Sequence, residues 1–311
     1  MHVVIADDYQ HCIRTLECFP LLRGHTVTIH HDTVTSIDGL AARYAPADAI
    51  VLIRERTRVT DELLERLPRL KLIAQTGKVA GHLDVAACKR RGIAVTESQG
   101  AGGATVELTM LLALASLRHL VDEANHLRAG GWQRSLGRQL AGRALGVYGF
   151  GRIGTQVARL AHAFGARVLV YGRSGSCERA SAAGYEVAAS REEFFASCEL
   201  LSLHLRLTAE TRSIVTANDL SRMRPDAILL NTSRAELIEP GALVAALRAG
   251  RPGFAAVDVF EEEPVLGASH PLLSLPNCLC TPHLGFVERD NYEAYFRAAF
   301  ESINAFAAAA R

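Results

Sequence analysis

The stretch Gly149-Phe150-Gly151-Arg152-Ile153-Gly154 follows the apolar run Leu145–Tyr148 and opens a segment with the apolar period of a helix. Glycine at its first position permits a tight turn, at its second lets the backbone approach a pyrophosphate, and at its third lets the helix pack close to the strand. The start of that helix presents N–H groups and a partial positive charge to phosphates. The stretch therefore predicts a dinucleotide-binding turn with Gly149, Gly151, Arg152, Ile153 and Gly154 at the cofactor.

The residues after the next predicted strand, Arg167–Tyr171, bear on the choice of cofactor. A unit that binds NAD usually carries Asp or Glu about 20 residues beyond the glycines, where it accepts hydrogen bonds from ribose hydroxyls. Here the chain continues with Gly172-Arg173-Ser174-Gly175-Ser176 and has no carboxylate at this point. Arg173 can pair with a 2′-phosphate through two hydrogen bonds, and Ser174 and Ser176 can donate to it. We therefore expect NADP to be preferred, with NAD left open. The alternative is an exposed arginine in a Gly/Ser turn.

Outward from this unit, short apolar runs alternate with segments of helical period, which is typical of βαβ units and parallel sheets. A chain of 311 residues suits two domains, each large enough to bury its own core. The expected fold class is α/β, with two Rossmann-like, doubly wound parallel-sheet domains and a cleft between them. The predicted strands lie near Val3–Ala6, Val27–Ile29, Ala49–Ile53, Leu72–Ala74, Ile93–Val95, Leu145–Tyr148, Arg167–Tyr171, Leu200–Leu203, Ala227–Asn231, Ala255–Val257 and Cys278–Thr281.

Two long helices are predicted in addition to the helix of the glycine-rich turn. The first spans about Thr105–Arg128 and ends at Gly130-Gly131, because helices commonly end at glycine. The second covers about Val287–Phe306, where aromatic residues recur at helical spacing. Such a stripe indicates a helix packed on a core.

Composition and charge exclude several classes of protein. Apolar residues make up 49% of the chain, and 34 basic residues balance 33 acidic ones to a net charge of +1. This composition argues against a disordered chain and gives no electrostatic reason to bind nucleic acid or an anionic membrane. The longest apolar run, Leu108–Leu117, falls short of the ~20 residues that a membrane span requires. Met1 leads directly into an apolar stretch, without the basic region of a signal peptide.

The cysteines point to the compartment. Seven scattered cysteines, an odd number, fit reduced thiols in a cytoplasm better than a disulfide framework. Cys278 and Cys280 can lie on one face of a strand, but two thiols without further ligands indicate core packing rather than a metal site. We expect a cytoplasmic protein without a metal.

Three polar residues each follow an apolar strand in the second half of the chain. Arg234 lies in Asn231-Thr232-Ser233-Arg234, Asp258 begins an acidic loop that ends at Glu263-Pro264, and His283 lies in Thr281-Pro282-His283. Open α/β sheets bind ligands at the carboxyl ends of their strands. The three residues are therefore expected at one edge, beside the glycine-rich turn. Taken singly, Arg234 also fits a salt-bridged arginine, the loop of Asp258 a solvated acidic loop, and His283 a surface histidine.

Together these motifs resemble the D-isomer-specific 2-hydroxyacid dehydrogenases, over essentially the whole chain. The resemblance implies that residues 1–98 form a substrate-binding lid domain, completed by a C-terminal helix at 286–311, and that residues 99–285 bind the dinucleotide. It implies a homodimer, in which Trp132 reaches the partner's active site; the alternative is a tryptophan in the core. The cofactor-binding residues that it adds are Thr105, His204, Arg206, Thr232 and Asp258.

The resemblance also assigns catalytic roles. Arg234 holds the substrate's carboxylate and carbonyl, His283 is the general acid/base, and Glu263 hydrogen-bonds His283. Asp258 contacts the nicotinamide carboxamide. The chemistry agrees. Negative charge grows on the carbonyl oxygen during reduction, and an imidazolium neutralises it by donating a proton. A nearby carboxylate stabilises the charged form of that imidazole. A guanidinium matches a 2-oxo acid as a planar fork.

Several positions depart from the family pattern. The lid loop, usually rich in glycine, keeps Gly77 but carries Lys78, and Arg54 follows the strand Ala49–Ile53. Arg54 and Lys78 suggest a substrate with a second negative group, although Arg54 can equally pair with an acid such as Glu55. Arg206 replaces a usual proline and Ala235 a usual glycine.

The expected function is an NADP-preferring reductase that interconverts a small 2-oxo acid and a D-2-hydroxy acid. Two alternatives remain open. One is a corepressor-like protein that senses the cofactor, and the other is a formate dehydrogenase of the same family.

Overall fold

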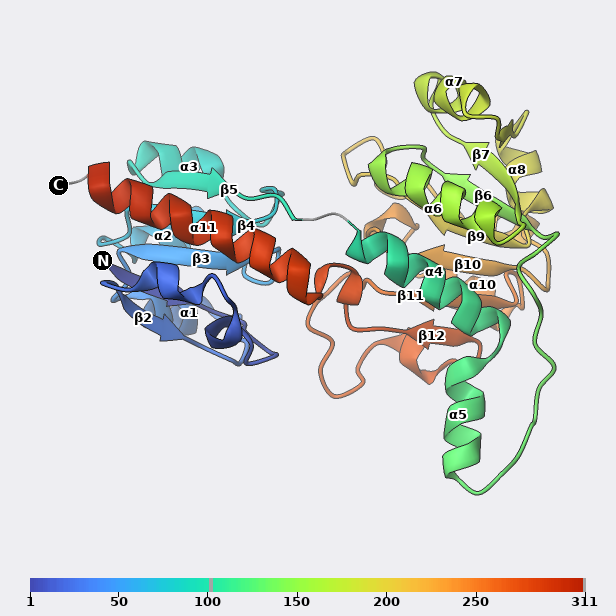
Figure 1. Cartoon of the computed structure of the whole chain (residues 1–311), viewed down its shortest axis with the longest axis horizontal. Helices are drawn as coiled ribbons and strands as arrows, with labels where there is room; N and C mark the ends of the chain where they lie inside the picture. Colours follow the sequence, from blue (N-terminus) through green and yellow to red (C-terminus); the bar gives the residue numbers. More distant parts are fainter. Residues whose placement is uncertain (101–102, 310–311) are drawn as a thin grey trace. The chain divides into compact units, whose positions relative to one another are not determined.

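The structure is a computed structural model that describes residues 1–100 and 103–309. The chain divides into two compact units (Figure 1), Met1–Gly102 with Val287–Arg311, and Gly103–Phe286. The sequence predicts the boundaries between these two units after residues 98 and 285. Each unit has its own sheet and its own hydrophobic core.

The first unit contains a parallel sheet with strand order β2-β1-β3-β4-β5. Its strands are β1 (His2–Ile5), β2 (Thr26–Ile29), β3 (Ala49–Ile53), β4 (Leu72–Thr76) and β5 (Ala94–Glu97). Its helices are α1 (Ile37–Tyr44), α2 (Asp61–Glu65), α3 (Val85–Arg90) and α11 (Arg289–Ala309), with 3₁₀ turns at Ile13–Thr15 and Phe19–Leu22. The helix α11 returns to this sheet and packs on β4 and β5.

The second unit contains a parallel sheet with strand order β12-β11-β10-β9-β6-β7-β8. Its strands are β6 (Ala144–Tyr148), β7 (Arg167–Tyr171), β8 (Glu186–Val187), β9 (Leu200–Leu203), β10 (Ile228–Asn231), β11 (Phe254–Val257) and β12 (Cys278–Cys280). Its helices are α4 (Ala104–Leu117), α5 (Leu120–Arg128), α6 (Arg152–Ala163), α7 (Ser174–Ala182), α8 (Arg191–Ser197), α9 (Ala217–Arg222) and α10 (Ala242–Arg248), with 3₁₀ turns at Ala235–Leu237, Pro271–Ser274 and Leu284–Phe286.

The two parallel sheets confirm the predicted α/β class. Every predicted strand is present, within two residues of its predicted ends. The short β8, Glu186–Val187, was not predicted, because two residues carry no measurable apolar period.

The single helix predicted over Thr105–Arg128 is wrong, because the chain forms α4 and α5 with a bend of 62° between them. His119 adopts a left-handed backbone (φ 50°) at the junction. The reason is burial, since α4 is apolar and largely buried, whereas α5 is charged and none of its residues is buried. The predicted end at Gly130-Gly131 is confirmed, with Gly130 at φ 86°.

The aromatic stripe near the C-terminus lies in α11 and packs as predicted. Tyr292, Phe296, Phe300 and Ile303 are each at most 3% exposed. No single helix of the described residues is long and apolar enough to span a membrane, and α4 with α5 pass that test only as a bent pair. The described residues hold no group of three or more His, Cys, Asp or Glu side chains that could bind a metal ion.

Candidate active site

The glycine-rich turn joins β6 to α6 in the geometry that a pyrophosphate requires. Gly149 has φ 95°, and a Cβ there would lie 2.7 Å from the His204 carbonyl oxygen. A Cβ on Gly154 would lie 2.1 Å from the Gly149 oxygen, so α6 can pack on β6 only with glycine at this position. A Cβ on Gly151, at the start of α6, would face open space. A dinucleotide therefore fits this turn, with its phosphates near the first N–H groups of α6.

The residues that follow β7 begin a helix. Ser174 starts α7 and Arg173 precedes it as the N-cap, so the chain begins a helix here rather than a Gly/Ser turn, and the contact of Arg173 with a cofactor stays a prediction. Arg173 and Ser174 are both exposed. The hydrogen bond from the Thr208 hydroxyl lowers the pKa of the Glu210 carboxyl, and the positive charge of Arg173 adds to this shift.

The loop after β9 holds two predicted cofactor residues. The imidazole Nε2 of His204 lies 2.8 Å from the hydroxyl of Ser202, and burial lowers the pKa of His204 to about 4. The imidazole is therefore neutral at neutral pH. Arg206 is exposed. The cofactor contacts of both residues stay predictions.

Arg234 follows β10 on a loop that is fixed by hydrogen bonds. The amide of Asn231 donates to the Arg234 carbonyl (2.9 Å) and accepts from the Ser233 N–H (3.0 Å). The Ser233 hydroxyl donates to the Leu203 carbonyl on the neighbouring strand β9 (2.6 Å). Asn231 was not predicted as a site residue; a polar residue that ends an otherwise apolar strand is the signal that would have found it.

Asp258, at the end of β11, organises the loop that carries His283. Its fully buried carboxylate accepts hydrogen bonds from the Thr281 hydroxyl (2.6 Å), the Leu284 N–H (2.7 Å) and the Gly285 N–H (2.8 Å). Burial raises the pKa of Asp258, although these hydrogen bonds oppose the shift. Both oxygens bind the protein's own loop, and the contact with nicotinamide stays a prediction. Thr281 was not predicted as a site residue.

His283 and Glu263 form the contact that the resemblance implies. The Nδ1 atom of His283 lies 2.6 Å from Oε2 of Glu263, and the two side chains are 22% and 30% exposed. The other carboxylate oxygen of Glu263 accepts the Phe260 N–H (2.9 Å). Among the described residues this is the only hydrogen bond of the His283 ring. Glu263 therefore fixes the ring's orientation through Nδ1, so that the second ring nitrogen stays available.

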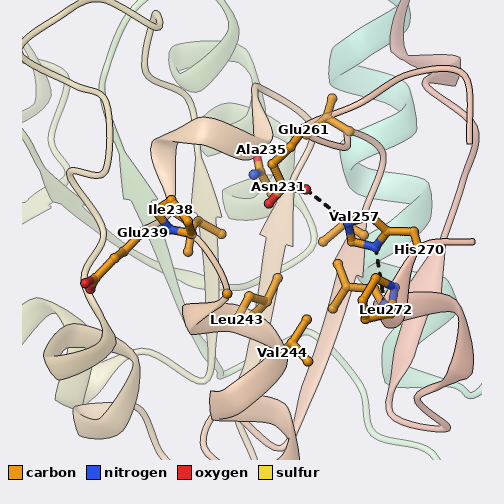
Figure 2. A pocket seen from close by; sticks show the side chains of 14 residues that line it. Asn231, Ala235, Ile238, Glu239, Leu243, Val244, Val257, Glu261, His270 and Leu272 are labelled. Atoms are coloured by element: carbon orange, nitrogen blue, oxygen red, sulfur yellow. Dashed lines mark hydrogen bonds and ion pairs between the residues drawn. The ribbon is translucent and has the colours of Figure 1, made fainter.

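The strand order brings these groups together. Arg234, Asp258 with Glu263, and His283 follow the adjacent strands β10, β11 and β12, whose carboxyl ends lie at one edge of the sheet. A cavity of about 310 Å³ is lined by Ala235 and Val257 together with Glu261 and His270, and Nε2 of His270 lies 3.0 Å from Oε2 of Glu261 (Figure 2).

Two buried threonines link the start of α4 to this edge. The Thr109 hydroxyl lies 2.7 Å from that of Thr232, and it also donates to the Thr105 carbonyl (2.7 Å). The Thr105 hydroxyl donates to the Gly285 carbonyl (2.6 Å). Thr105 and Thr232 therefore join α4 to the loops after β12 and β10, and their predicted cofactor contacts remain predictions.

The predicted lid residues belong to the first unit. Arg54 has a left-handed backbone (φ 53°), and its N–H donates to the Thr76 hydroxyl (2.9 Å). Its guanidinium lies 5.6 Å from the centre of the Tyr295 ring, and a Cβ on Gly77 would lie 1.7 Å from its Nη1. Gly77 therefore makes room for Arg54, and the neighbouring Lys78 is exposed.

Trp132 is 72% exposed, so the alternative of a core tryptophan is wrong. It lies in the connection between α5 and β6, where Leu136 is 95% exposed. By contrast, Cys278 and Cys280 are partly buried against the core, as the packing interpretation predicts.

Comparison with known proteins covers both units. Residues 110–285 match the NAD binding domain of the D-isomer specific 2-hydroxyacid dehydrogenases. Over 278 residues the chain is 37% identical to a glyoxylate reductase from Aeropyrum pernix, which covers 86% of this chain and 82% of that protein. A phosphoglycerate oxidoreductase from Vibrio cholerae superposes with a TM-score of 0.97 at 50% identity, covering 99% of both chains. An oxidoreductase from Ralstonia solanacearum gives a TM-score of 0.97 at 48% identity, covering 99% of this chain and 94% of that one.

Proposed function

This chain belongs to the D-isomer specific 2-hydroxyacid dehydrogenases, and we propose that it is an NADP-preferring reductase of a small 2-oxo acid with a second negative group. The observation that carries the proposal is the 2.6 Å contact of His283 with Glu263, on the sheet edge that also carries Arg234 and the glycine-rich turn. An acid/base group, a cation for a carboxylate and a nucleotide site are the parts that such a reduction needs.

Each side chain has a distinct task in this proposal. When bound, the nicotinamide cofactor supplies the two-electron reduction of the substrate carbonyl. Arg234 binds the carboxylate of the 2-oxo acid and orients its carbonyl. His283 donates the proton that the carbonyl oxygen takes up, and Glu263 holds the imidazole by Nδ1. Asp258 keeps the loop of His283 in place through its three hydrogen bonds.

The reaction is tested by turnover with a panel of 2-oxo acids and both nicotinamide cofactors. We expect reduction of at least one 2-oxo acid, and we expect Arg234→Gln to lower kcat/KM by ~10²-fold or more, the scale of a lost charge-assisted pair. Glu262→Gln, which removes an exposed charge from the loop of Glu263, is the matched control. If the wild type reduces no 2-oxo acid, or if Arg234→Gln turns over normally, the proposed reaction fails.

NADP preference rests on Arg173, an exposed cation at the start of α7 with no carboxylate in the position that would bind ribose hydroxyls. We expect Arg173→Ala to lower kcat/KM for NADPH by about tenfold, the value of one hydrogen bond to a charged group, and to leave NADH almost unchanged. Arg222→Ala is the control, because it removes another exposed arginine of the same unit, at the end of α9. A wild type that uses NADH at least as well as NADPH contradicts this preference.

The second negative group of the substrate is assigned to Arg54 and Lys78. The phosphoglycerate oxidoreductase relative supports a phosphate as that group. The backbone strain at Arg54 and the space that Gly77 leaves for its guanidinium indicate a fixed position rather than a solvated side chain. The double variant Arg54→Ala/Lys78→Ala should raise KM for dianionic 2-oxo acids about tenfold more than for pyruvate. Equal changes in both KM values would rule out this role.

We also propose a homodimer in the cytoplasm. Several apolar side chains of α5 and of the connection after it are more than half exposed: Leu120, Leu127, Trp132 and Leu136. Exposed apolar side chains gathered in one segment mark a contact surface, and a second copy of the chain is the occupant we assign to it. All seven cysteines are free, which fits a reducing compartment.

The homodimer is tested by sedimentation of the wild type and of Trp132→Gln/Leu136→Gln. We expect a dimer for the wild type and a monomer for the variant, with Leu266→Gln, an exposed apolar residue elsewhere, as the control. A monomeric wild type removes the dimer from the proposal.

A further inference from the structure

Cys278 and Cys280 form a pair of thiols on the strand that leads to His283. Alternate residues of a strand share a face, and the two sulfur atoms lie 3.6 Å apart on β12. This strand is at the edge of the sheet and pairs only with β11, where Ala255 is opposite Cys278 and Val257 is opposite Cys280. Among the described residues it is the only cysteine pair with sulfurs in contact.

A small cavity of about 100 Å³ reaches Cys278, one member of this pair. Cys278 lines it, together with Ser116, His119 and Asp122 from the end of α4 and the start of α5. The Ser116 hydroxyl oxygen is buried and has no hydrogen-bond partner among the described residues. A cavity of this size, with polar groups in its wall, holds small polar molecules such as water or hydrogen peroxide.

The contact between the sulfurs also favours reaction. The hydrogen bond from Cys278 lowers the pKa of Cys280 and raises that of Cys278, so Cys280 is the member of the pair that forms the thiolate, the reactive form of cysteine. The other cysteines of this unit lack such a partner. Cys177 donates to the Gly172 carbonyl (3.4 Å), and Cys198 is buried in apolar surroundings, which raises its pKa to about 12.

We propose that Cys278 and Cys280 are a peroxide-sensitive dithiol that closes to a disulfide and thereby displaces His283. In the first step the thiolate attacks one oxygen of hydrogen peroxide and the O–O bond breaks, so that the sulfur becomes a sulfenic acid; the leaving hydroxide takes up the proton that the thiol had lost and departs as water. In the second step the other thiol attacks that sulfur, the S–O bond breaks, and a second water leaves. The two thiols lose two electrons and two protons, and one peroxide becomes two waters.

Closing the bond must deform the strand. A disulfide is about 2.05 Å long, so the sulfurs must approach by about 1.5 Å, and its Cα atoms are most often about 5.5–6 Å apart. Alternate residues of an extended strand are about 6.6 Å apart, so a disulfide in its preferred geometry shortens the strand. Cys280 is followed directly by Thr281, whose N–H donates to the Val257 carbonyl (2.9 Å) and whose hydroxyl donates to Asp258 (2.6 Å). Shortening β12 therefore pulls on the loop of His283.

The dithiol is tested by mass spectrometry of the full-length protein after treatment with hydrogen peroxide and alkylation of the remaining thiols. Cleavage after lysine and arginine releases residues 249–289 as one peptide, because Arg251 precedes proline, and this peptide contains Cys278 and Cys280 but no other cysteine. We expect it to carry no alkyl group and to be lighter than the reduced peptide by two hydrogen atoms. If both thiols remain alkylated under conditions that oxidise Cys177, the proposal is overturned.

The effect on the site is tested by turnover, and this part rests on the proposed function. We expect oxidation to lower kcat by ~10²-fold, the scale of a 1 Å displacement of a catalytic group, and dithiothreitol to restore it. Cys278→Ser should keep basal activity and resist peroxide, whereas Cys177→Ser should respond like the wild type. Full activity of the bridged protein, or equal sensitivity of Cys278→Ser, overturns the link to His283. If the reduced protein turns over no 2-oxo acid, the proposed function fails, while the mass of the peptide still decides whether the dithiol closes.

Discussion

The substitution Asp258→Asn tests how the catalytic loop is held. The carboxylate has two acceptor oxygens, of which Oδ1 accepts the Thr281 hydroxyl and the Leu284 N–H, while Oδ2 accepts the Gly285 N–H. Asparagine keeps only one acceptor. Its least costly orientation leaves the oxygen at Oδ1 and turns the NH₂ group towards the Gly285 N–H, so that two buried donors face each other.

The size of the effect follows from these contacts. A hydrogen bond to a charged group contributes about 1.5–3 kcal/mol, and a buried unsatisfied donor costs about 1–3 kcal/mol. Burial opposes this loss, because it raises the pKa of Asp258 and so disfavours the charged form that asparagine removes. We expect the free energy of unfolding to fall by about 2–4 kcal/mol and kcat to fall by ~10²-fold, because the loop of His283 loses its anchor.

Urea unfolding and steady-state turnover measure the two quantities on the same preparation. Glu262→Gln removes an exposed carboxylate four residues away and serves as the control for net charge. A variant that matches the wild type within about 0.5 kcal/mol, the usual range of surface substitutions, and that keeps its kcat would refute the role of Asp258 as the anchor.

Two further predictions concern the nucleotide side of the second unit. Gly154→Ala places a Cβ 2.1 Å from the Gly149 oxygen, so α6 must move away from β6, which lowers the free energy of unfolding by about 1–3 kcal/mol. Calorimetry should show weaker NADPH binding, and an unchanged Kd would contradict the assignment of this turn to the cofactor. Burial lowers the pKa of His204 to about 4 from 6.5. Between these values the unfolded chain binds a proton that the folded chain does not. The contribution of His204 to stability is therefore full above about pH 6.5 and falls by up to ~3 kcal/mol towards pH 4. His204→Gln should flatten this acid-side loss in urea titrations at several pH values, and an equally steep loss in the variant would mean that other groups cause it.

The sequence predicted the elements that carry a strong local pattern. The parallel strands are continuous apolar runs, and the three polar groups of the site follow such runs directly, so the sheet edge at Arg234, Asp258 and His283 was predictable. The break at His119 was not, because α4 and α5 differ in burial rather than in helix propensity, and burial depends on the sheet against which α4 packs.

The hydrogen bonds that hold the loops of Arg234 and His283 could not be predicted either. The network of Asn231, Thr281 and the threonine pair Thr109–Thr232 joins residues that are far apart in sequence. Polar residues of these types are common at strand and helix ends, and only the register of the sheet decides which of them meet. The 3.6 Å approach of Cys278 to Cys280 was predictable as a shared face, whereas the cavity beside it needs the end of α4.

Turnover and nucleotide binding of His283→Asn test the central claim most directly. If the imidazole, held by Glu263, transfers the proton to the substrate oxygen, the variant should reduce its 2-oxo acid with a kcat lowered by ~10²-fold or more, while its Kd for NADPH stays that of the wild type. A variant with wild-type kcat would contradict the assignment of the proton donor, and with it the reaction proposed for this chain.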